Sequence, residues 1–163
     1  GLEQLYSVHL YDCSVLSDLS SLSSLPSLKE LELIGDIPYN AAVLEKLGDL
    51  DMLLLSGNDA AYRYVHNKRI GMLRLSGAEM EDLSSISTVT GLTELQLNCP
   101  SLHSLEGIEV HEGLHKLDFW ALGAVDLSPL LALPNLNELV LPADAQADVS
   151  ALKAKPGLTI TYQ

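Results

Sequence analysis

A short leucine-rich pattern recurs along the chain, and it constrains the fold more than any other feature of the sequence. Seven segments fit apolar-x-x-apolar-x-apolar, where x is any residue: "LYSVHL", "LKELEL", "LDMLLL", "IGMLRL", "LTELQL", "LHKLDF" and "LNELVL". They begin at residues 5, 28, 50, 70, 92, 114 and 136, so the spacings are 23, 22, 20, 22, 22 and 22 residues. A further step of 22 reaches Leu158 in "LTITYQ", which gives eight turns of chain. The pattern predicts a short strand in every turn.

A second motif, Asp-apolar-Ser, lies about midway between these segments. It occurs at residues 18–20, 82–84, 126–128 and 148–150. Serine is a good N-cap, so we expect each serine to begin a short helix or 3-10 turn. Pro129, directly after Ser128, suits the first helical position, where no amide donor is needed. The serine-rich run at 17–24 is then one more capped turn, although its composition would also suit a flexible linker.

These residues carry a family resemblance. The chain resembles a leucine-rich-repeat array of the 22-residue class, and "VDLSPLLALPNLNELVL" at 125–141 is similar to bacterial, internalin-like repeats. The resemblance implies an α/β fold, a right-handed leucine-rich-repeat solenoid of about seven to eight repeats. A parallel sheet would line its concave side, with short helices or 3-10 turns on the convex side. Because solenoids normally need capping elements, we expect residues 1–163 to be a single repeat domain from a longer protein.

Charge and cysteine content limit the partners and the compartment. Asp and Glu total 22 against 9 Lys and Arg, a net charge of −13, which disfavours nucleic acid and membrane surfaces as partners. No apolar run approaches the ~18 residues that a membrane span needs. Cys13 and Cys99 lie four repeats apart, roughly 19 Å at the usual strand spacing, and a disulfide needs Cα atoms within ~7 Å. We therefore expect free thiols and a cytoplasmic protein.

One stretch, "HEGLH" at residues 111–115, matches the H-E-x-x-H zinc motif, and Glu138 lies where some zinc proteases place a third ligand. Zinc binding would need both histidines on one helical face. In the repeat register, however, Leu114 begins a strand, and Gly113 weakens any helix across the site. We expect no catalytic or metal-binding residues, no cofactor and no enzymatic activity.

Alternation along each strand predicts which side chains face outward on the concave side. An apolar cluster of Met52, Leu54 and Met72 would either bind a partner or be covered by local loops or another domain. Trp120, the only tryptophan, would lie beside Val140 and either bind a partner or pack on its own loop. The partner-binding candidates are Met52, Leu54, Met72, Arg74, Gln96, Asp118, Trp120 and Val140.

The third repeat is two residues short and carries a basic group. Arg63, Lys68, Arg69 and Arg74 are four of the chain's nine basic residues. They would either dock an acidic surface or line the polar side of a longer amphipathic helix.

Together these features favour a non-catalytic protein–protein recognition module that binds a protein partner through its concave face. The alternative comes from the turn motif and "PGLT" near the end, which are similar to the ligand-sensing C-terminal repeats of bacterial NACHT-type signalling ATPases. In that case the array would sense a ligand for the attached ATPase.

Overall fold

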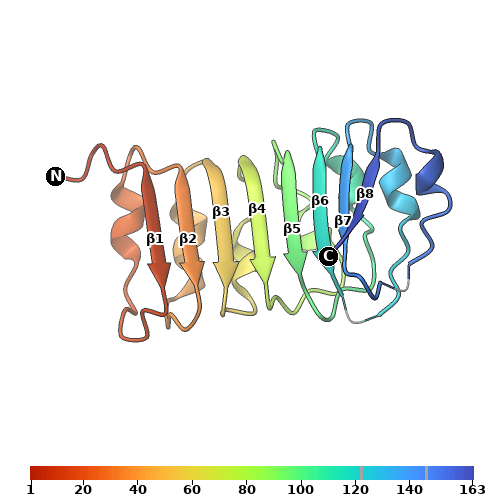
Figure 1. The fold of residues 1–163 in the computed structure, drawn as a ribbon. Coiled ribbons are helices and arrows are strands. Elements are labelled where there is room, and N and C mark those ends of the chain that lie inside the picture. Colours follow the sequence, from red (N-terminus) through yellow and green to blue (C-terminus); the bar gives the residue numbers. More distant parts are fainter. Residues whose placement is uncertain (122, 146) are drawn as a thin grey trace.

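The computed structural model describes residues 1–121, 123–145 and 147–163. In these residues eight parallel strands stand side by side in chain order and form one sheet (Figure 1). The strands are β1 (Ser7–Tyr11), β2 (Glu30–Ile34), β3 (Leu50–Ser56), β4 (Ile70–Ser76), β5 (Glu94–Asn98), β6 (Lys116–Trp120), β7 (Glu138–Leu141) and β8 (Thr159–Tyr162). Every segment that the repeat predicts as a strand is one.

A short 3-10 helix follows each of the first seven strands on the opposite side of the array, behind the sheet in Figure 1. These are η1 (Ser20–Ser24), η2 (Ala41–Lys46), η3 (Ala61–Tyr64), η4 (Ser84–Ile86), η5 (Ile108–Val110), η6 (Ser128–Ala132) and η7 (Leu152–Ala154). The predicted succession of strand, loop, short helix and loop is confirmed.

Leucines stacked between the sheet and the 3-10 helices form the core. The fourth position of the repeat is at most 1% exposed at Leu31, Leu53, Leu73, Leu95, Leu117 and Leu139. Each such burial stabilises the fold by about 1.5–3 kcal/mol. Val8 and Leu10, by contrast, are only half-buried, because β1 has a neighbouring strand on one side alone.

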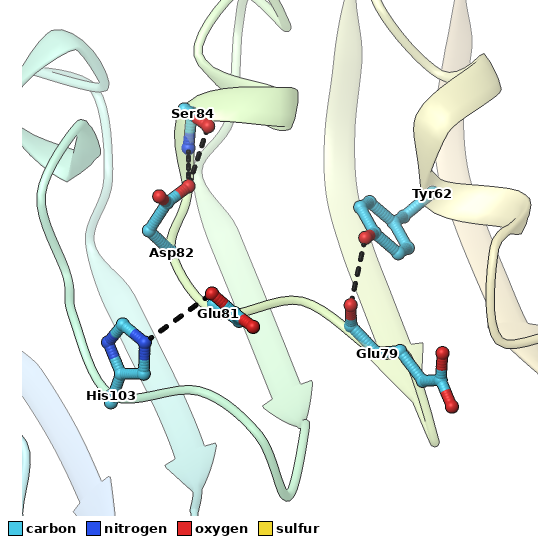
Figure 2. A network of polar contacts seen from close by, with 6 residues as sticks. All are labelled: Tyr62, Glu79, Glu81, Asp82, Ser84 and His103. Carbon is cyan, nitrogen blue, oxygen red and sulfur yellow. Dashed lines mark hydrogen bonds and ion pairs between the residues drawn. The ribbon is translucent and has the colours of Figure 1, made fainter.

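The helix caps differ from the sequence prediction. The serine of each Asp-apolar-Ser motif is not the N-cap. Instead, the aspartate two residues earlier accepts a hydrogen bond from the backbone amide of the serine. Ser84 N, for example, donates to Asp82 Oδ1 at 2.9 Å (Figure 2). The same bond occurs at 18–20, 126–128 and 148–150. The Ser84 hydroxyl donates to the same carboxylate, and both bonds lower the pKa of Asp82. A carboxylate accepts these donors better than a hydroxyl does, which explains the exchange of roles.

The third repeat contains only the four-residue η3, so the longer amphipathic helix predicted there is wrong. Its basic residues do not form one patch. Lys68 is buried, and its Nζ donates to the carbonyls of Glu45 (3.0 Å) and Leu47 (2.6 Å) at the end of η2. Arg63 packs over the Tyr62 ring, whose hydroxyl donates to the Glu79 carbonyl (Figure 2). Arg74 lies instead on β4.

Candidate functional site

The sheet face opposite the 3-10 helices carries three parallel rows of side chains, which together we call the concave face. Strand register defines the entry rung as Ser7, Glu30, Met52, Met72, Glu94, Lys116, Glu138 and Thr159. The middle rung is His9, Glu32, Leu54, Arg74, Gln96, Asp118, Val140 and Thr161. The exit rung includes Ser56, Ser76, Asn98 and Trp120. All eight sequence-predicted binding residues lie on these rungs, so the alternation placed them on the correct face.

Exposure separates these eight residues. Met52 and Met72 are adjacent in register and half-exposed, so they present apolar surface to solvent. Leu54 is different: it is only 9% exposed between Glu32 and Arg74. Arg74 lies beside Leu54 in register, and the aliphatic stem of an arginine covers neighbouring apolar surface. The expected exposed cluster is therefore a pair, Met52 and Met72.

Val140 is likewise buried on the middle rung, at 6% exposure. Its partners in register are Asp118 and Thr161. Trp120 pairs with Asn98 on the neighbouring strand and lies two residues beyond the partner of Val140. The predicted exposed pair of Trp120 and Val140 is thus reduced to Trp120.

Trp120, which is half-exposed, borders a hollow on the concave face. The hollow has a volume of about 340 Å³ and is lined by Arg74, Gln96, Leu97, Asn98, Asp118, Trp120 and Gln163. Gln163 reaches back to donate to both carboxylate oxygens of Asp118 at 3.3 Å. The sequence analysis did not select Asn98 or Gln163 as binding residues. The repeat register offers the missing signal for both, since Asn98 ends β5 and Gln163 directly follows β8.

A second hollow, of about 120 Å³, lies on the loop side of Trp120, where Phe119, Val125 and Pro142 are among its lining residues. Trp120 therefore borders both the concave hollow and the hollow formed by the loops that follow β6 and β7. The two sequence alternatives for Trp120, partner binding and packing on its own loop, are both compatible with this position.

Most charged groups on the concave face have a partner. Glu32 accepts a hydrogen bond from the Tyr11 hydroxyl and lies 3.8 Å from His9 Nδ1. Lys116 Nζ lies 2.9 Å from Glu138 Oε1, and this hydrogen bond is the main cause of the raised pKa of Lys116. In the described part of the chain, Glu30, Glu94 and Arg74 form no ion pair. These three charges are available to a ligand.

The H-E-x-x-H stretch does not form a helix. Val110 ends η5, and residues 111–115 make a turn that leads into β6. His111 is buried at 4% exposure, whereas His115 is exposed. Burial lowers the pKa of His111, and its Nε2 has no hydrogen-bond partner. Outside residues 122 and 146, no group of three His, Cys, Asp or Glu side chains is arranged to hold a metal ion.

Cys99 is buried, Cys13 is half-buried, and both are free thiols, as the repeat spacing predicts. Burial raises the pKa of the Cys99 thiol to about 11, so this group is a poor nucleophile. In the described residues no helix is long and apolar enough to span a membrane.

The stacked parallel strands, the buried leucine columns and the 3-10 helices define a right-handed leucine-rich-repeat solenoid. No family model and no curated protein sequence matches the chain significantly. Among solved structures it is similar to internalin C2 from Listeria monocytogenes, with a TM-score of 0.74 and 26% sequence identity. That match covers 99% of this chain and 73% of internalin C2. The chain is therefore a leucine-rich-repeat solenoid, and its repeats are similar to those of internalins.

A second internalin from Listeria monocytogenes, inlF, has a TM-score of 0.59 at 18% identity. The match covers 98% of this chain and 62% of the other, and at this identity it shows the fold alone. The likeness to internalins supports a protein-interaction module as the general class of function.

Proposed function

We propose that the chain is a non-catalytic recognition module that binds a protein partner through the concave face. The observation that carries this proposal is the half-exposed pair Met52 and Met72, together with Trp120 at the rim of the 340 Å³ hollow. All three lie on the sheet face opposite the seven described 3-10 helices (Figure 1). Methionine adapts its shape to different partners, and tryptophan is enriched among the residues that contribute most to binding.

The test is affinity capture from a bacterial lysate with quantitative mass spectrometry. Wild type is compared with Met72→Asp/Trp120→Ala, which changes the concave face without touching the buried Leu54. A matched control, Val110→Asp/Leu131→Ala, changes two exposed apolar residues on η5 and η6. Circular dichroism verifies that all three chains are folded.

We expect specific partners with wild type and with the control, and their loss with the concave-face variant. Equal recovery by all three baits would place binding elsewhere and refute the proposal. Loss with the η5/η6 variant alone would assign binding to the convex side.

We also propose a cytoplasmic location, because the two free thiols suit a reducing compartment. The sensor role in a bacterial signalling ATPase is the second hypothesis. No feature of the described residues favours it over a stand-alone module, so the capture experiment comes first.

A further inference from the structure

Near the N-terminal half of the entry rung, two methionines lie between two glutamates. Strand register places Glu30 beside Met52, Met52 beside Met72, and Met72 beside Glu94. Two apolar, half-exposed side chains thus lie between two half-exposed carboxylates on four consecutive strands. With strands about 4.8 Å apart, the two carboxylate positions are separated by roughly 14 Å.

Glu30 and Glu94 differ from the other carboxylates of the concave face. Glu32, Asp118 and Glu138 each accept a hydrogen bond from a neighbouring side chain. In the described residues Glu30 and Glu94 have neither an ion pair nor a side-chain hydrogen bond to the rest of the chain. Glu94 does lie near Lys116, but the ammonium of Lys116 is already paired with Glu138 at 2.9 Å.

Apolar surface flanked by free carboxylates is well suited to bind basic side chains. Lysine and arginine have long aliphatic stems that pack on apolar surface while the charged head stays at its edge. The thioethers of Met52 and Met72 can adapt to such a stem, and each carboxylate can then pair with a cationic head. The chain's net charge of −13 further attracts a basic segment during encounter.

We propose that the rung Glu30–Met52–Met72–Glu94 binds a segment of the protein partner that carries two basic side chains with an apolar side chain between them. This inference rests on the proposed concave-face function and names the chemistry of its partner. The two basic groups lie roughly 14 Å apart. In an extended segment this corresponds to about four residues at ~3.3 Å each, a spacing that keeps both side chains on one face.

Arg74 favours a partner of the opposite charge. It is exposed on the middle rung, two residues beyond Met72 on β4, and would instead attract an acidic segment into the 340 Å³ hollow. The rung is favoured because it has two free carboxylates and two apolar side chains in register, whereas Arg74 is a single free charge in a hollow that is also lined by the carboxylate of Asp118.

The probe is a random-peptide library displayed on phage and selected on the immobilised full chain. Enriched peptides are synthesised and their affinities measured by fluorescence polarisation at low and high salt. The tested chains are wild type, Glu30→Gln/Glu94→Gln and Arg74→Gln. A matched control, Glu106→Gln/Glu112→Gln, removes two exposed carboxylates outside the sheet and changes the net charge equally.

We expect selected peptides to be rich in Lys and Arg around an apolar residue. They should bind about tenfold more weakly to Glu30→Gln/Glu94→Gln, which is about threefold for each exposed ion pair that is lost. Their binding to wild type should also weaken at high salt, because salt screens exposed ion pairs. The Glu106→Gln/Glu112→Gln control should bind within about twofold of wild type.

Two results would overturn the inference and leave the proposed function standing: acidic peptides whose binding depends on Arg74, or basic peptides that bind all four chains equally but lose binding to Met72→Asp/Trp120→Ala. Peptides insensitive to every concave-face variant would overturn the proposed function as well.

Discussion

Replacing Gly57 with alanine would test whether the turns after the strands are held by backbone-to-backbone stacking. Gly57 follows β3 with φ +83°, and an added Cβ would lie 2.7 Å from the carbonyl carbon of Gly35 and closer still to its oxygen. Gly77 occupies the same place after β4 with φ +76°, but nothing lies within 4 Å of its Cβ position. The two glycines therefore share a backbone conformation and differ in contact.

The magnitudes follow from that difference. A left-handed conformation costs an alanine about 1–2 kcal/mol, and this is the whole expected effect of Gly77→Ala. Gly57→Ala adds the displacement of the Gly35 backbone, comparable to overpacking at about 1–3 kcal/mol. We expect a total loss of about 3–4 kcal/mol for Gly57→Ala, and a fall in Tm of roughly 10 °C against about 4 °C for Gly77→Ala.

The assay is urea-induced unfolding, followed by far-ultraviolet circular dichroism and by the fluorescence of Trp120. Both probes are needed, because repeats contact mainly their neighbours and can unfold separately. If Gly57→Ala and Gly77→Ala lose the same free energy of unfolding, stacking of the turns contributes nothing and the reasoning is refuted.

Three further predictions concern polar groups that support the repeats. Asp82→Ala should lower the free energy of unfolding by about 0.5–1 kcal/mol at pH 7. Because folding depresses the pKa of Asp82, the difference between wild type and variant should fade as the pH falls through and below the unfolded-state pKa near 3.8. Lys68→Met should lower the free energy of unfolding by about 1–3 kcal/mol in urea titrations, since two backbone carbonyls at the end of η2 lose their hydrogen-bond donor. As a control, Lys46→Met at an exposed position should change the free energy of unfolding by less than about 0.5 kcal/mol. Folding lowers the pKa of His111, so the unfolded chain takes up a proton at higher pH than the folded chain, and the free energy of unfolding should fall as the pH drops below 6.5. His111→Leu should weaken this pH dependence between about pH 7.5 and 5. If the variant shows the same pH dependence as wild type, His111 is not its source.

Several features that matter for function were predictable from the sequence. The period of 22 residues fixed the strands, and alternation then assigned Met52, Arg74 and Trp120 to the concave face. Register was predictable as well, because a slip by one residue would move every core leucine to the wrong face. The rejection of a helix at 111–115 followed from the same register and is confirmed.

The helix caps were predicted wrongly, although the sequence contains the pattern that identifies the aspartate as the acceptor. The Asp-apolar-Ser spacing is that of an aspartate accepting the amide two residues later, a pattern as local as the serine cap that was predicted. The serine preference alone could not choose between them.

By itself, the sequence determined the solenoid, its register and the composition of each rung, because these depend on periodic burial of leucine. Only the tertiary structure decided how much of each concave side chain meets solvent. Leu54 and Val140 are buried while Met52 and Met72 stay half-exposed, and Gln163 reaches Asp118 across 45 residues of sequence. Alternation gives the face of a side chain, but its exposure depends on the length and direction of neighbours from other repeats, which exist only once the strands are stacked.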